Sequence, residues 1–119
     1  MYNKILFLDD EIIYPIISYK IYSKGDIYNY FQYELFVEIS KNNFNSNSHI
    51  LSDKDLVLFS EDNLECDFFS KTYFNTILQN EISYCLSFEV AHINKFNLSD
   101  IDCLKHIARD LKIKSILDI

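Results

Sequence analysis

Residues 82–91 read ISYCLSFEVA, and this stretch decides the fold class because apolar and polar side chains alternate along it. Such a period of two is typical of a β-strand that buries one face and leaves the other in water. The inward set comprises Ile82, Tyr84, Leu86, Phe88 and Val90, and the outward set comprises Ser83, Cys85, Ser87, Glu89 and Ala91. We therefore predict a strand over residues 82–91 and expect further strands to pair with it.

The same alternation occurs in residues 31–40, and another strand is predicted upstream, over residues 12–22. The single glycine of the chain, Gly25, lies between them, where a chain reversal needs a positive φ angle. These two strands are therefore expected to form an N-terminal hairpin. Pro15 cannot donate a backbone hydrogen bond, so it favours a sheet edge. Residues 5–8 add a short buried strand.

A C-terminal helix is predicted from residue 98, where Ser99 is placed to cap it. Its apolar residues recur at helical spacing and share one face: Ile101, Leu104, Ile107, Ala108 and Leu111. Residues 113–119 are expected to close the chain as a short strand or a packed tail. Residues 51–60 and 68–79 are candidates for shorter helices, although the apolar run in the first also suits a strand.

Together these elements predict an α+β fold in a single domain, residues 1–119. An antiparallel sheet of about four to five strands, including the N-terminal hairpin, is covered on one face by the C-terminal helix and by any shorter helices. Two polar loops are expected, one over residues 41–48 with Phe44 as its anchor and an exposed acidic one over residues 61–67. A chain of 119 residues can bury a core without a metal or a disulfide.

The negative charge of the chain is concentrated between residues 53 and 67. Six carboxylates and one lysine give this segment a net charge of −5, out of −7 for the whole chain. The six acids are Asp53, Asp55, Glu61, Asp62, Glu65 and Asp67. Charge gathered in one place steers and selects partners of opposite sign, and it repels nucleic acid and anionic lipid. We predict that these six residues bind a basic protein, and we expect neither nucleic acid nor a membrane as partner.

Three tyrosines, Tyr22, Tyr28 and Tyr30, gather around the turn of the predicted hairpin, where little core exists to bury them. Tyrosine provides a large contact area at a small entropic cost and is enriched in protein interfaces. We therefore predict that these three side chains form a secondary contact with the protein partner.

The residue usage argues against most catalytic and cofactor sites. With a single glycine, the chain cannot build the glycine-rich phosphate loops, dinucleotide turns or nucleophile elbows that need backbone without a β-carbon. The lone arginine, Arg109, argues against an arginine-based phosphate clamp. Cys103 and His106 have a spacing that a metal site can use, but zinc needs about four ligands. We expect no cofactor, no metal and no enzymatic activity.

A cytoplasmic location is expected from the cysteines and from the N-terminal segment. The three cysteines share no short spacing and are interpreted as reduced, buried thiols. The apolar run at residues 5–8 is too short for a signal sequence, and three acids follow it. Abundant Ile, Asn, Lys, Phe and Tyr, with scarce Gly, Pro, Arg and Ala, indicate an AT-rich gene of the kind found in low-GC bacteria and phages.

These observations favour a stoichiometric protein inhibitor over the other functional classes. The best fit is a bacterial immunity protein that neutralises a basic, nuclease-type toxin, because a nuclease active site must be cationic to hold nucleic acid. Immunity proteins paired with secreted or contact-delivered toxins, as in contact-dependent inhibition, are often small, acidic and free of motifs. A phage-encoded inhibitor would share these features. The alternatives are a small enzyme or ligand-binding domain with His92 or His106 in a pocket, and an adaptor subunit of a larger complex.

Overall fold

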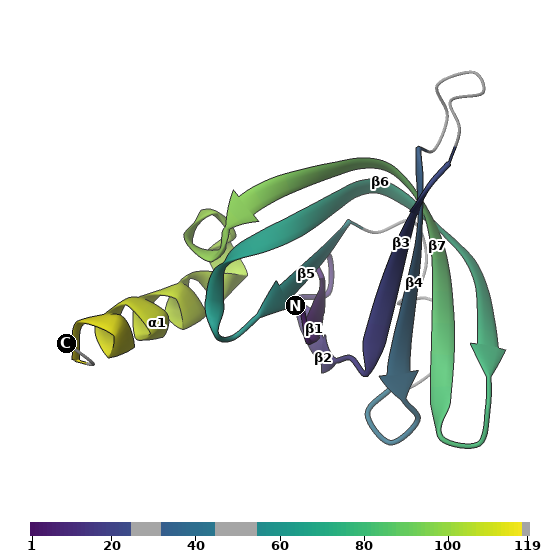
Figure 1. Cartoon of the computed structure of the whole chain (residues 1–119), viewed down its shortest axis with the longest axis horizontal. Helices are drawn as coiled ribbons and strands as arrows, with labels where there is room; N and C mark the ends of the chain where they lie inside the picture. Colours follow the sequence, from purple (N-terminus) through teal and green to yellow (C-terminus); the bar gives the residue numbers. More distant parts are fainter. Residues whose placement is uncertain (25–31, 45–54, 118–119) are drawn as a thin grey trace.

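In the computed structural model, which describes residues 1–24, 32–44 and 55–117, the chain forms a seven-stranded antiparallel sheet and a C-terminal helix (Figure 1). The strands are β1 (Lys4–Phe7), β2 (Ile12–Pro15), β3 (Ser18–Ser23), β4 (Tyr33–Ser40), β5 (Leu56–Ser60), β6 (Asn63–Gln79) and β7 (Ser83–Asn97). Their order in the sheet is β2-β1-β5-β6-β7-β4-β3. The antiparallel sheet and the C-terminal helix are confirmed, but the expected four to five strands are too few.

The N-terminal hairpin is confirmed, since β3 pairs with β4 along its whole length, but it starts later than predicted. Residues 12–22 divide into β2 and β3, which lie at opposite edges of the sheet. Two residues join these strands: the amide of Ile16 donates to the Asn3 carbonyl at 2.9 Å, and that of Ile17 donates to the Glu38 carbonyl at 2.8 Å. Because neighbouring residues reach both edges, the sheet curls until the edges meet. Pro15 ends β2 at an edge, as predicted.

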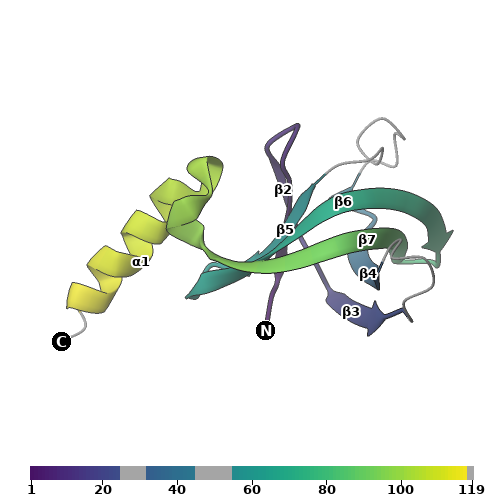
Figure 2. The ribbon, with the colours of Figure 1, turned by 90° about the horizontal axis from the view of Figure 1, so that it is seen from above.

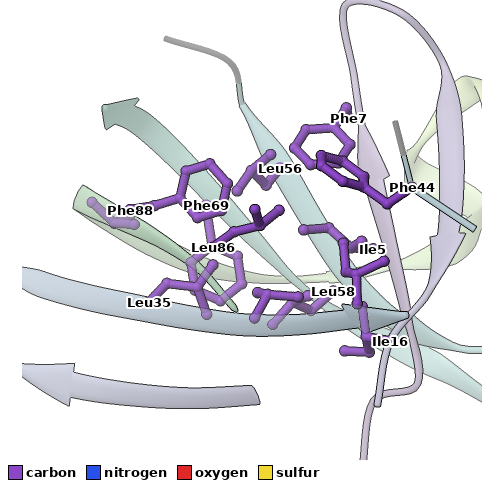
Figure 3. Packing of buried hydrophobic residues seen from close by; sticks show 13 residues of the cluster. Ile5, Phe7, Ile16, Leu35, Phe44, Leu56, Leu58, Phe69, Leu86 and Phe88 are labelled. Carbon is purple, nitrogen blue, oxygen red and sulfur yellow. The ribbon is translucent and has the colours of Figure 1, made fainter. Parts of the chain in front are cut away.

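The curl encloses the larger of two hydrophobic clusters (Figure 3). Its fully buried members include Ile5, Phe7, Leu35, Leu56, Leu58, Phe69 and Leu86. The second cluster lies on the other face of β1, β5 and β6, beneath the C-terminal helix. The strand β5 contributes to both, because Leu56 and Leu58 belong to the first cluster and Val57 and Phe59 to the second. A strand buried on both faces shows no alternation. Of the two alternatives left open for residues 51–60, the strand is confirmed over residues 56–60 and the helix is wrong there, while residues 51–54 lie outside the described residues.

The long strand β6 replaces both the acidic loop predicted over residues 61–67 and the helix predicted over residues 68–79. Only Glu61 and Asp62 form the turn between β5 and β6. β6 pairs first with β5 and β7 and then with β7 alone, and Figure 1 shows the two long strands arching across the molecule. At Lys71 the backbone has a φ of 53°, and its amide donates to the Asp55 carboxylate at 3.1 Å. This left-handed residue bends β6.

The strand predicted over residues 82–91 is confirmed as β7, which starts at Ser83 and continues to Asn97. Phe44 is buried as the predicted anchor and packs edge-on against Tyr14 and Tyr84. Such ring pairs add stability beyond the area that they bury.

Two short 3-10 turns, Leu98–Asp100 and Asp102–Leu104, precede the helix α1 (Lys105–Leu117). Asn97, rather than Ser99, caps the first turn: its side chain accepts from the Ser99 amide, and the Asp100 carboxylate accepts from the Asn97 amide. The predicted apolar face is confirmed, with Leu104 and Ala108 buried in the second cluster. The tail expected over residues 113–119 is helical as far as Leu117. Figure 2 shows α1 extending beyond the strands. None of the helices in the described ranges has the length and apolarity needed to cross a bilayer.

Candidate functional site

The six carboxylates predicted to bind a partner have different surroundings, and two of them accept hydrogen bonds from residues of the sheet. Asp55 accepts the Lys71 amide at 3.1 Å and thereby supports the bend of β6. Asp67 is buried in β6, and Lys95 of β7 donates to it at 3.1 Å. This contact raises the pKa of Lys95 above its usual value. The prediction that Asp67 lies in an exposed loop is therefore wrong, because strand pairing turns it toward the interior of the curl. Asp53 lies outside the described residues.

Glu61 and Asp62 are exposed, and they face α1 across an open hollow of about 650 Å³. Asp110 of α1 adds a third carboxylate to its lining, beside His106 and Lys114. We call this surface the acidic hollow. Within the part of the chain that the structure describes, none of its three carboxylates takes part in an ion pair. Their charge is therefore available to a partner.

The acidic hollow exists because the second hydrophobic cluster fixes α1 against the sheet. Leu104 and Ala108 are buried in that cluster, with Ile107 and Leu111 packed at its margin. When these residues of α1 face the sheet, the helical spacing places Asp110 at the side of the helix that lies beside the β5–β6 turn. The sequence offered no local signal for Asp110, since only the docking of α1 brings it near Glu61.

An apolar surface adjoins the acidic hollow at the end of α1. The side chains of Ile113, Ile116 and Leu117 are 49%, 69% and 78% exposed. Ile116 lines a second open hollow together with Asp62, Leu64 and Lys112, so the apolar and acidic surfaces are continuous. These residues do not pack as the tail predicted from the sequence.

Glu65 is exposed but does not join the acidic hollow. It lines a smaller hollow of about 250 Å³ with Lys95, Phe96, Asn97 and Asp100. Strand alternation explains the separation, because Glu65 points to the opposite face of β6 from Leu64.

Tyr22 lies on the outer face of β3, where its ring packs edge-on against Phe36 of β4 with a centroid distance of 5.6 Å. Its side chain is 51% exposed. β3 lies in the right half of Figure 1, whereas the β5–β6 turn lies near α1 at the left. The structure therefore does not bring Tyr22 and the acidic hollow together. Tyr28 and Tyr30 lie outside the described residues.

The three cysteines are free thiols, and Cys66 alone is fully buried. Burial, followed by the charge of Asp67, raises the pKa of the Cys66 thiol to about 11. Burial also raises the pKa of Cys85 and Cys103. Over residues 1–24, 32–44 and 55–117, no three His, Cys, Asp or Glu side chains are grouped so that they could hold a metal ion. The thiols therefore have the surroundings of structural rather than reactive cysteines.

Comparisons of the chain with protein-family models, with curated protein sequences and with solved structures find no match.

Proposed function

We propose that the protein is a stoichiometric inhibitor that binds a basic protein partner through the acidic hollow. The observation that carries this proposal is that three carboxylates, Glu61, Asp62 and Asp110, surround one open hollow and have no ion pair with any of the described residues. A nuclease active site fits this surface well, since it must be cationic to hold nucleic acid. The proposed role is that of an immunity protein for a nuclease-type toxin.

The lining of the hollow suits a protein interface as well as an ion pair. Ile13, Ile107 and Leu111 contribute apolar surface between the carboxylates, and Ile116 extends it along α1. Protein interfaces combine a desolvated apolar centre with charged groups at the rim. In this arrangement the apolar residues supply affinity, while the carboxylates accelerate association and fix its orientation.

The cations of α1 restrict how a basic partner can approach. Lys114 lines the acidic hollow, and Lys112 lines the neighbouring one beside Asp62. A partner with basic groups spread along the helix would meet these lysines, whereas one that inserts its basic groups between the turn and α1 would meet the carboxylates. Such unfavourable contacts contribute to specificity as much as the favourable ones do.

The proposal is tested by a triple variant, Glu61→Gln/Asp62→Asn/Asp110→Asn, with Glu81→Gln as the matched control. Glu81 is exposed in the turn between β6 and β7, away from the hollow. We expect wild type and control to co-purify the same basic protein from the native host and to abolish its nuclease activity at a ratio of about 1:1. The triple variant should retain the fold, since exposed substitutions usually change stability by only about 0.5 kcal/mol, and it should lose this inhibition. Equal inhibition by the triple variant would contradict the proposal.

A further inference from the structure

A separate hollow of about 420 Å³ lies on the outer face of the sheet, over β3, β4 and β7. We call it the outer hollow. Its lining includes the carboxylate of Glu38, the rings of Tyr22 and Phe36, and the side chains of Lys20 and Cys85. α1 does not cover this face, since it packs mainly against the 3-10 turns and β6.

The Glu38 carboxylate is held in a fixed orientation. The hydroxyl of Ser83 lies 2.7 Å from one of its oxygens, and that of Ser18 lies 3.2 Å from the other. Ser83 is fully buried, and its amide is itself held by the Asn80 side chain at 2.8 Å. A carboxylate positioned by donors on two neighbouring strands is prepared to bind a ligand without reorganisation.

The two hydroxyls that hold Glu38 are neutral, so these hydrogen bonds leave its negative charge in place. Among the described residues Glu38 has no ion pair, although Lys20 lines the same hollow. The nearby Glu34 and Glu89 carry a further two negative charges, which Lys24 offsets in part. Three carboxylates thus stand against two lysines, Lys20 and Lys24, and this part of the outer face favours a cation over an anion.

The aromatic rings beside Glu38 favour one class of cationic ligand over others. Tyr22 and Phe36 pack edge-on at 5.6 Å and leave Tyr22 half exposed above the hollow. A planar guanidinium can stack on such a ring while it donates two hydrogen bonds to a carboxylate, whereas a compact ammonium cannot do both.

From this geometry we infer that the outer hollow is a subsite for an arginine side chain of a protein partner, with Glu38 as the ion-pairing group and Tyr22 as the stacking surface. The inference goes beyond the acidic hollow, and it rests on the proposed function only in that the partner is basic. It also gives Tyr22 a specific role as the ring that covers the guanidinium.

The test is an NMR titration of the whole chain with N-acetyl-arginine amide, with N-acetyl-citrulline amide as the uncharged control of similar shape. We expect saturable shifts of the Ser18, Phe36 and Cys85 amides with the arginine compound alone. Glu38→Gln should weaken this binding about tenfold, because it removes a charge-assisted pair. Tyr22→Leu should weaken it about two- to fivefold through the loss of stacking. Glu81→Gln should leave it unchanged.

Equal shifts with the citrulline compound, or shifts confined to the Glu61 and Asp62 amides, would overturn the inference. If Glu38→Gln fails to fold, Tyr22→Leu still tests the inference, because Tyr22 is exposed and its replacement should leave the fold intact. Light scattering gives a further check, since a dimer that disappears in Arg109→Gln would assign the outer hollow to a second copy instead. None of these outcomes affects the acidic hollow, because its own test uses other residues and the partner's activity.

Discussion

Asp67 is buried and accepts a hydrogen bond from Lys95, whereas Glu61 and Asp62 face solvent and form no ion pair within the described part of the chain. All three carboxylates lie within residues 61–67, so their surroundings rather than their position in the sequence separate them. A buried charge is costly unless it is paired, which makes Asp67 a structural group. The exposed pair lacks that constraint and is free to serve binding.

The reactivity of a single residue, Cys66, tests how tightly the second hydrophobic cluster is packed. We expect iodoacetamide at pH 8 to modify Cys85 and Cys103 in the folded protein well before Cys66. A thiol with a pKa of about 11 is only about 0.1% thiolate at that pH, and the Cys66 side chain is also fully buried. Peptide mass spectrometry would follow each site, and guanidinium chloride should make the three rates similar. Rapid labelling of Cys66 in the native protein would show that the second hydrophobic cluster is less tightly packed than described.

Among the strands, β4 and β7 place Glu34 directly opposite Glu89. Like charges in this arrangement destabilise a sheet. Lys24, next to β3, relieves the repulsion: its Nζ lies 3.0 Å from Glu89 and 3.5 Å from Glu34, and these contacts raise the pKa of Lys24. Lys24 therefore offsets the repulsion between these two glutamates.

We predict that Lys24→Met destabilises the protein by about 1 kcal/mol at pH 7, a value limited by the partial exposure of the pair. Because the pKa of Lys24 is raised in the folded state, its contribution is complete below the usual value of 10.5 and is lost as the pH rises through the folded pKa. Urea denaturation should therefore show a smaller difference between wild type and variant at pH 11 than at pH 7.

A double variant gives the control for this prediction. Adding Glu89→Gln to Lys24→Met should restore part of the lost stability, since only Glu34 then remains charged. A Lys24→Met variant as stable as wild type at pH 7 would show that solvent already screens the two glutamates.

Alternation predicted the strand over residues 33–40 correctly, because Leu35, Val37 and Ile39 are buried and the residues between them are partly exposed. Residues 83–91 are also a strand, but the predicted inward and outward sets hold only in part: Ser83 and Ser87 are buried, and Ile82 is 72% exposed. Helix and strand stayed open for β5 because it is buried on both faces, and β6 was missed because it bends at Lys71 and shifts register between Phe74 and Thr76. A bend and a register shift each interrupt the period of two, so β6 gives no continuous alternation.

Only the part of the candidate site that depends on local sequence could be predicted. Glu61 and Asp62 form a polar turn, which sequence can identify locally. Asp110 joins them only because α1 docks through Leu104 and Ala108, a tertiary contact without a local signature. Glu38 is likewise positioned by Ser18 and Ser83, which come from two other strands.

Across the whole molecule, which measures 47 × 36 × 23 Å, the two candidate surfaces lie on different parts of the sheet. The acidic hollow lies between the β5–β6 turn and α1, and the outer hollow lies over β3, β4 and β7. α1 carries four of the 11 lysines and arginines of the chain and a single acid, so the rest of the molecule is more acidic than the net charge of −7 indicates. A basic partner is therefore drawn toward the sheet and its turns rather than along the helix.

The most direct test of the account is the rate at which the chain associates with its purified partner, measured by stopped flow over a series of salt concentrations. For wild type and Glu81→Gln we predict fast association that slows as salt shortens the screening length below about 10 Å. Glu61→Gln/Asp62→Asn/Asp110→Asn should associate about tenfold more slowly at low salt and depend less on salt, with an unchanged melting temperature. A triple variant that associates as fast as wild type, with the same salt dependence, would contradict the claim that the acidic hollow binds a basic partner.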